Sequence, residues 1–191
     1  MDLLTAYRRS LFGFTQRVAQ VRPHQWSVPT PCVEWDVRAL VNHLVGENLR
    51  TVPLLEGATP EEAGDGLTGD LLGDDPAAVA TTAATAAAAA VAAPGAMKRT
   101  VRLSSGDVPA TEYVYRLLAD HLVHAWDLAV AVGVDPRLDP DAVRLCAGWF
   151  TDREDVYRAG RAIGPRVPVP VTADPQDRLL GAFGRNPNWS P

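Results

Sequence analysis

Three side chains of this chain have the types that bind a divalent metal ion. His43 lies in one apolar segment with helical spacing, and Asp120 and His124 lie four residues apart in another. Catalytic zinc sites typically take three imidazole or carboxylate ligands and leave a fourth position open to water or substrate. The sequence therefore predicts a three-ligand metal site. Zinc is the first candidate, and nickel and iron stay open because imidazole and carboxylate accept all three metals.

The spacing of the second segment supports this site. At 3.6 residues per turn, positions i and i+4 lie on one face of a helix, so Asp120 and His124 can reach the same ion. Asp127 falls on that face one turn later, where its carboxylate could orient His124 or anchor a backbone group. His121 is rotated by roughly 60° from His124, which predicts a bystander or a residue at the rim.

Two further residues share the helical face of His43. Glu47 follows it by four residues, and a fourth metal ligand, a general base and a solvated helix charge all fit that position. Arg50 follows by seven residues and could bind a substrate carboxylate, although an exposed arginine fits equally well. Together with Asp127, Glu47 and Arg50 are the candidate catalytic residues.

Each of these residues, considered alone, could also have a purely structural role. A histidine on an apolar helix is more often a core or rim residue than a ligand, and Asp120 with His124 also fits a hydrogen bond on a helix surface. His24 lies in a proline-rich segment, where the sequence offers no partner for it. Only the combination of His43 with the pair on the second helix favours a metal.

Helical periodicity and capping residues predict the elements that must position these side chains. We expect helices over residues 2–20, 36–55, 76–93, 109–132, 139–160 and 174–183. Pro53 should end or kink the second helix. Residues 22–35 should form a packed connecting loop, 57–75 an exposed loop, 98–103 a short strand or extended connector, and 166–171 an extended segment.

The expected fold is therefore all-α, with a four-helix core formed as a single domain over residues 1–191. Helix bundles commonly build metal sites from inward-facing side chains on facing helices. His43 lies in the middle of one expected helix, and Asp120 and His124 lie in the middle of another. This agreement between the fold and the residue types strengthens the metal prediction.

Composition and charge limit the classes of partner. The chain has 191 residues, 47% of them hydrophobic and 21% charged, which is ordinary for a globular protein. A net charge of -5 disfavours nucleic acid, and no apolar run is long enough to cross a membrane, so we expect a cytoplasmic protein. Cys32 and Cys146 are far apart and lack CxxC spacing, which disfavours a disulfide framework or a structural zinc module.

Three segments resemble one protein family. They are TPCVEWDVRALVNHLVGEN at 30–48, DHLVHAWDLAVAVG at 120–133 and VPVPVTADPQDRLLGAFGRNP at 167–187. Together they resemble actinobacterial metal-binding proteins related to the N-terminal domain of mycothiol-dependent maleylpyruvate isomerase, in the DinB-like superfamily. The resemblance implies a DinB-like four-helix bundle that holds a divalent metal, usually zinc, through His43, Asp120 and His124. The isomerase has glutamate in place of Asp120 and a further C-terminal domain, so fold and metal transfer better than its reaction.

Two imidazoles and one carboxylate leave a divalent ion with a net charge of about +1, which favours an anionic fourth ligand such as thiolate or hydroxide. The leading hypothesis is a metal-dependent enzyme that activates a low-molecular-weight thiol for transfer to, or isomerisation of, a small electrophilic metabolite. The resemblance supplies mycothiol as the cosubstrate. The alternatives are a hydrolase or lyase that uses metal-bound water, and a non-catalytic metal- or ligand-binding protein. The alanine-rich helix at 76–93 could line a homodimer contact or an apolar substrate tunnel.

Overall fold

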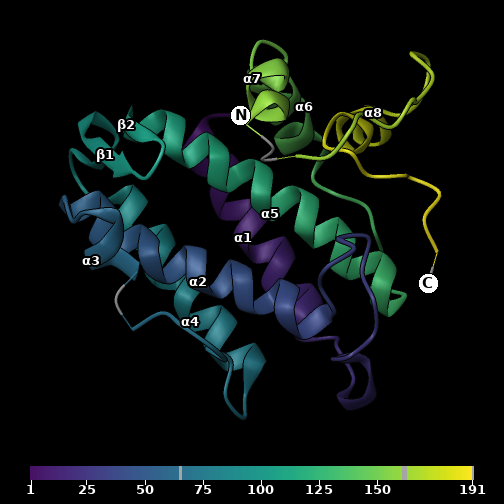
Figure 1. Cartoon of the computed structure of the whole chain (residues 1–191), viewed down its shortest axis with the longest axis horizontal. Coiled ribbons are helices and arrows are strands. Elements are labelled where there is room, and N and C mark those ends of the chain that lie inside the picture. Colours follow the sequence, from purple (N-terminus) through teal and green to yellow (C-terminus); the bar gives the residue numbers. More distant parts are fainter. Residues whose placement is uncertain (65, 161–162, 191) are drawn as a thin grey trace.

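Four long helices form the body of the molecule in the computed structural model, which describes residues 1–64, 66–160 and 163–190 (Figure 1). They are α1 (Leu3–Val18), α2 (Val37–Glu56), α4 (Pro76–Ala92) and α5 (Ala110–Val132). α1 and α2 each pack against both α4 and α5, so the four helices surround a common core. The predicted all-α fold with a four-helix core is confirmed, and the ends of these helices lie within about two residues of the expected ones.

Short polar residues and glycines fix the ends of these helices. Asp2, Asp36 and Asp75 precede α1, α2 and α4, and each side chain accepts a hydrogen bond from a backbone N–H in the first turn. α2 and α5 end at Gly57 and Gly133, whose φ angles of 102° and 73° lie in the left-handed region that glycine adopts without steric cost. The cap at Asp36 determines where α2 begins and therefore where His43 lies along it.

Alanine allows α4 to lie close to its neighbours. The side chains of Ala80, Ala83 and Ala87 are buried against α1 and α2, and larger residues of those helices fill the remaining space. Phe14 of α1 and Leu44 of α2 are completely buried in the same core. The small alanine side chains thus contribute helix propensity and close approach, while their neighbours supply the apolar volume.

Residues 57–75 contain a short helix, α3 (Pro60–Gly64), where the sequence predicted only an exposed loop. Thr59 and Glu62 form a reciprocal capping box, in which Thr59 N–H donates to the Glu62 carboxylate at 2.8 Å and Glu62 N–H donates to the Thr59 hydroxyl at 3.3 Å. Ala63 is 3% exposed and packs beside α2. The capping residues are visible in the sequence, but one buried alanine is too weak a periodic signal to predict the helix.

Residues 96–109 form a 3₁₀ turn followed by a hairpin. The turn η2 (Ala96–Lys98) leads into β1 (Thr100–Leu103), which pairs in antiparallel register with β2 (Gly106–Pro109), so that Val101 lies opposite Val108. The strand expected at 98–103 is present, and its partner was not predicted. The hairpin lies at the N-terminal end of α5 and contacts that helix (Figure 1).

Pro53, which was expected to end or kink this helix, lies inside α2 and does not end it. The helix continues to Glu56, and Leu54 and Leu55 beyond the proline are 4% and 1% exposed. A proline inside a helix costs about 3 kcal/mol. Burial of two leucine side chains contributes a comparable stabilisation of about 1.5–3 kcal/mol each, which explains why the last turn persists.

The single helix expected over 139–160 is two helices, α6 (Pro140–Phe150) and α7 (Glu154–Ala159). The chain turns at 151–153, and the Arg153 side chain donates a hydrogen bond from Nε to Glu112 of α5 at 3.2 Å. This turn brings Tyr157 to 5.7 Å from both Trp149 and Phe150, measured between ring centroids. The aromatic cluster and the long-range ion pair thus stabilise a turn between α6 and α7, although the apolar periodicity of residues 139–160 predicts one continuous helix.

The C-terminal elements cover one side of α5. α8 (Pro175–Ala182) packs on α6, and Phe183 stacks on Phe150 with ring centroids 4.0 Å apart. The residues after α8 return toward α5 (Figure 1). Within the described ranges, no helix is both long and apolar enough to cross a membrane.

Candidate metal centre

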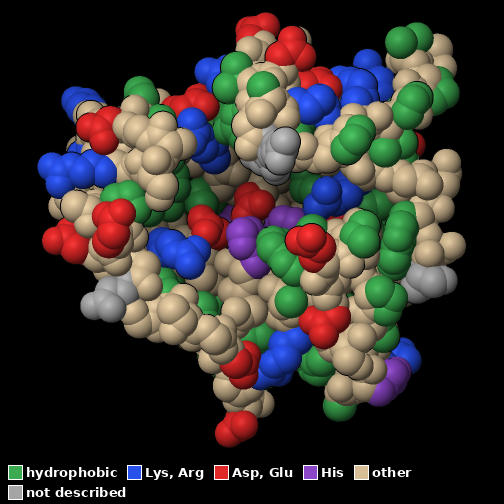
Figure 2. Space-filling model, viewed as in Figure 1, with side chains coloured by type: hydrophobic (Ala, Val, Ile, Leu, Met, Phe, Trp, Pro, Cys, Tyr) green, Lys and Arg blue, Asp and Glu red, His purple; other side chains and the backbone are tan. Residues whose placement is uncertain are grey.

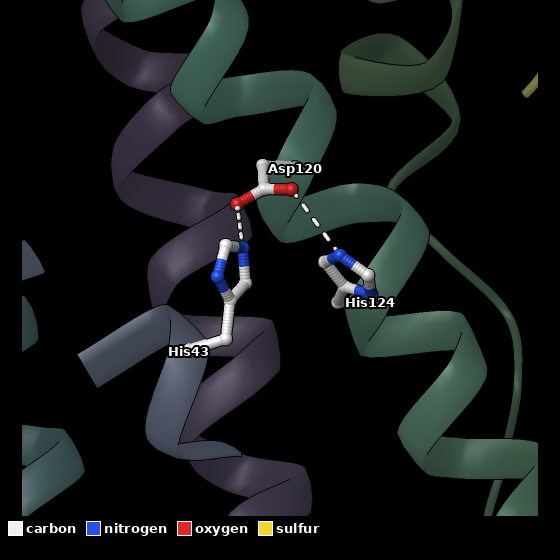
Figure 3. A group of neighbouring side chains, drawn as sticks. All are labelled: His43, Asp120 and His124. Atoms are coloured by element: carbon white, nitrogen blue, oxygen red, sulfur yellow. Dashed lines mark hydrogen bonds and ion pairs between the residues drawn. The ribbon is translucent and has the colours of Figure 1, made fainter. Parts of the chain in front are cut away.

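His43, Asp120 and His124 lie together between α2 and α5 (Figure 3). Asp120 Oδ2 is 2.9 Å from His43 Nε2, and Asp120 Oδ1 is 3.2 Å from His124 Nε2. One candidate ligand atom from each residue lies within 4.8 Å of the other two. The structure thus brings together all three residues that the sequence predicts as ligands.

The donor atoms fit a divalent ion. Ligand distances of about 2.0–2.2 Å in a tetrahedral site place neighbouring donor atoms about 3.4 Å apart. The observed separations of 2.9 and 3.2 Å are shorter and join the two nitrogens to different oxygens of Asp120, so small shifts of the side chains would admit an ion. Both imidazoles direct Nε2 toward Asp120, one toward each oxygen of its carboxylate (Figure 3). The side chains of His43 and Asp120 are 28% and 30% exposed, which leaves a path from solvent to the site.

Asp127 holds the other ring nitrogen of His124. Its Oδ2 atom lies 2.9 Å from His124 Nδ1, as expected for a carboxylate that orients a metal-binding histidine. Asp127 is completely buried, and Arg185 compensates its charge by donating to both carboxylate oxygens at 2.9 Å. This hydrogen-bonded chain fixes the ring of His124 and leaves Nε2 as the nitrogen that faces the other candidate ligands.

The sequence does not predict Arg185 as a site residue. It follows α8 in the C-terminal tail, 58 residues from Asp127. As one of many arginines in the chain, it has no local spacing that connects it to α5. Its tail segment carries part of the family resemblance, and that is the only signal in the sequence that pointed to this region.

Trp35 closes one side of the centre. Its ring lies 4.6 Å from the ring of His43 and 5.4 Å from that of His124, measured between centroids. The loop that carries it is joined to the start of α2 by hydrogen bonds from Val37 N–H to Val28 O and from Arg38 N–H to Trp26 O. The sequence predicts only a packed connecting loop here, whereas the structure places its tryptophan directly against both imidazoles.

Without a metal ion, the charges of Asp120 and His124 stabilise each other. Burial opposes ionisation of Asp120, but His124 and His43 outweigh burial and hold the pKa of this carboxyl well below its ordinary value. Burial also opposes protonation of His124, yet Asp120 and Asp127 raise the pKa of its imidazole to about 9. Because both ring nitrogens of His124 face carboxylates, this imidazole is a cation at neutral pH in the metal-free protein.

A cavity of about 320 Å³ adjoins the three residues. In the space-filling view it appears as a hollow with histidine at its floor and charged side chains around it (Figure 2). Glu47 lines this cavity, and burial together with the nearby Asp120 raises the pKa of its carboxyl. Arg50 is not among the lining residues and instead forms an ion pair with Glu47 at 2.5 Å. Of the two additional residues on α2, only Glu47 therefore faces the space beside the centre.

His121 takes no part in the cluster, as the bystander prediction has it, and it does not lie at the rim. It is completely buried between Tyr7 and Phe14, and its Nδ1 lies 2.8 Å from Leu117 O of its own helix. Burial lowers the pKa of this imidazole to about 4. It therefore belongs to the core. His24 is exposed, at η1 (Pro23–Gln25), which agrees with the absence of a predicted partner.

The comparisons with known proteins assign the family. Residues 8–129 match the model of the mycothiol maleylpyruvate isomerase N-terminal domain, a span that contains all three candidate ligands. The chain belongs to this mycothiol-related, DinB-like, metal-binding family. It is also 34% identical to uncharacterized proteins of Mycobacterium tuberculosis strains CDC 1551 / Oshkosh and H37Rv, over 97% of this chain and 98% of each relative. No solved structure matches it significantly.

Proposed function

We propose that this chain is a divalent-metal-dependent enzyme that activates a low-molecular-weight thiol, with mycothiol as the first candidate. The thiol is transferred to a small electrophilic metabolite or promotes its isomerisation. The grouping of His43, Asp120 and His124, with candidate ligand atoms within 4.8 Å of one another beside a cavity, carries this proposal. Family membership supports the metal and the link to mycothiol.

His43 Nε2, the Asp120 carboxylate and His124 Nε2 are the groups that would hold the ion. Zinc is preferred and nickel or iron stay compatible with this donor set. When bound, such an ion supplies Lewis acidity that favours the thiolate form of a coordinated thiol at neutral pH.

The protein side chains around the centre have distinct tasks in this scheme. Asp127 and Arg185 keep His124 oriented, since their hydrogen bonds hold Nδ1 and leave Nε2 available. Trp35 covers the imidazoles and reduces access of water from its side. Glu47 accepts or returns a proton in the cavity, because the raised pKa of its carboxyl brings it closer to neutral pH.

A reconstitution experiment tests the proposal. Purified protein is stripped with a chelator, reloaded with one equivalent of zinc, nickel or iron, and assayed for addition of mycothiol to a panel of small electrophiles. We expect turnover that requires both the metal and the thiol. Full activity of the stripped protein contradicts the scheme, and ester hydrolysis without thiol would assign the hydrolase alternative.

Glu47→Gln separates the proton-transfer role from metal binding. We expect a loss of roughly 10²- to 10⁴-fold in kcat, the usual contribution of general acid–base catalysis, while the metal content stays unchanged. An unchanged kcat in this variant would remove Glu47 from the reaction but leave the metal and thiol steps intact.

A further inference from the structure

A second charged group in the cavity lies one helical turn from the centre. Arg116 precedes Asp120 by four residues on the same face of α5 and lines the same cavity. With a rise of 1.5 Å per residue, the two positions are separated by about 6 Å along the helix axis. The guanidinium Cζ atom of Arg116 lies 5.8 Å from the ring centroid of Tyr157, which forms another part of the cavity wall.

In the part of the chain that the structure describes, no carboxylate lies within hydrogen-bond distance of Arg116. Its nearest ion pair, from Nε to Glu112 Oε1, is 3.7 Å long. The Glu112 carboxylate is already occupied by Trp149 Nε1 at 2.9 Å and by Arg153 Nε at 3.2 Å. Among the described residues, Nε of Arg116 is buried without a hydrogen-bond partner, and its NH1 reaches only Ser105 Oγ at 3.5 Å.

The other charges around the cavity are balanced. Arg185 is bound to Asp127, and Glu47 is paired with Arg50. Glu112 is the shared carboxylate partner of Arg116 and Arg153. These three side chains therefore carry a net charge of about +1, and the more weakly paired arginine is Arg116. Because arginine presents a planar fork of donors that matches a carboxylate, the natural complement of Arg116 is an anionic oxygen pair.

We propose that Arg116 binds a carboxylate of the small molecule that reaches the metal centre. The inference rests on the proposed function and deepens it, because it specifies an organic acid whose reacting carbon lies only a few bonds from its carboxylate. A single arginine flanked by an aromatic ring suits a monoanionic carboxylate. The carboxylate belongs either to the electrophile or to the thiol.

Binding of an unreactive probe tests this site without any turnover. Pentanoate and pentanamide, which have similar size and differ in charge, are titrated by calorimetry into stripped and zinc-loaded protein. We expect both forms of the wild type to prefer the acid, and Arg116→Gln to weaken pentanoate binding roughly 10- to 100-fold while changing pentanamide less than about twofold. Loss of the preference when the metal is stripped would make the ion the carboxylate ligand and overturn the proposal.

Two variants control for charge and folding. Arg144→Gln removes an arginine that pairs with Asp141 on α6 and does not line this cavity, so we expect wild-type preference. Arg116→Lys keeps the charge but loses the fork, so we expect partial retention of the preference. Equal weakening in Arg116→Gln and Arg144→Gln would overturn the proposal, because the effect would then be one of net charge alone.

The source of the carboxylate is resolved by two matched pairs in the thiol-addition assay. Electrophiles are compared as 4-oxopent-2-enoate and its methyl ester, and thiols as 2-mercaptoacetate and 2-mercaptoacetamide. Arg116→Gln should reduce kcat/KM for only the charged member of one pair, which identifies the source. Equal effects on the charged and neutral members of both pairs contradict the site. The calorimetric preference is independent of thiol activation, so failure of the proposed reaction is distinguishable from failure of this inference.

Discussion

Two faces of α5 give opposite environments to histidines that lie only three positions apart. On the face toward the cavity, His124 contacts the carboxylates of Asp120 and Asp127. On the face toward α1, His121 lies 5.7 Å from the ring of Tyr7 and 5.9 Å from that of Phe14, between centroids. The pKa is about 9 for His124 and about 4 for His121, although both imidazoles are buried.

The difference shows that neighbouring charges, and not depth alone, decide what a buried histidine can do. Desolvation lowers the pKa of both imidazoles. Two carboxylates reverse this effect for His124. For His121, which lies against apolar rings, Asp120 and the contact with Leu117 O offset desolvation only in part. The first histidine is thus prepared to exchange a proton for another cation, and the second is held neutral as a core side chain.

The largest difference between the two faces should appear in metal content. His124→Ala removes a candidate ligand, so we expect stoichiometric metal in the wild type and almost none in the variant, a loss that exceeds the roughly 10- to 100-fold cost of removing an outer-shell partner. His121→Leu should retain the metal, as should His24→Ala at an exposed position. Elemental analysis after equilibrium dialysis measures all three, and full metal content in His124→Ala would refute the assignment of this ligand.

The buried ion pair behind His124 should contribute to both stability and metal affinity. Arg185→Gln leaves the buried carboxylate of Asp127 without its arginine partner, which we expect to cost about 3 kcal/mol of unfolding free energy and to weaken metal binding roughly 10- to 100-fold. Urea unfolding and competitive chelation measure the two effects. Arg166→Gln is the matched control: Arg166 pairs with Glu154 at the surface, and its loss should cost less than about 1 kcal/mol. Equal losses in the two variants would contradict the role of the buried pair.

His121 should make the stability of the stripped protein depend on pH. Its folded-state pKa of about 4 lies below the ordinary value of 6.5, so below pH 6.5 the unfolded chain takes up a proton that the folded chain refuses. The contribution of His121 to the free energy of unfolding is complete above pH 6.5, and it falls by about 3 kcal/mol as the pH drops to 4.

Urea unfolding at pH 7, 5.5 and 4 measures this dependence. His121→Leu should show a smaller decrease than the wild type, because the other titrating groups are common to both proteins. Parallel pH profiles would show that His121 is accessible to protons in the folded state.

The smallest effect is expected at the start of α2. Asp36→Ala removes the hydrogen bond from Ala39 N–H at 2.8 Å, which should cost about 1 kcal/mol of stability. Metal content should stay at the wild-type value, since the helix that carries His43 remains packed. Loss of metal in Asp36→Ala, with the protein still folded, would show that the cap and not the packing positions His43.

Local sequence patterns were sufficient for the features that depend on one helix at a time. Apolar periodicity and capping residues predicted the four long helices, and the four-residue spacing placed Asp120 and His124 on one face. His43 required the further assumption that α2 and α5 face each other, which the structure bears out. The three candidate ligands could therefore be chosen without coordinates.

Contacts between distant segments could not be predicted in this way. No local pattern connects Arg185 to Asp127, or Trp35 to the two imidazoles. The face of α5 occupied by His121 also depends on where α1 packs, which helical angle alone does not specify. Similarly, the division between α6 and α7 follows from an aromatic cluster and the ion pair of Arg153 with Glu112.

Because Asp120 lies between the two imidazoles, binding of a metal ion should release protons. Its ionised carboxylate accepts hydrogen bonds from both imidazoles, so their Nε2 atoms carry protons in the empty cluster. Capture of an ion by His124 Nε2 must release the proton of that nitrogen to the medium, because Nδ1 of the same ring is held by Asp127. Loading an unbuffered sample should consequently acidify it, and the protein should scavenge scarce metal more effectively in mildly alkaline surroundings than in acidic ones.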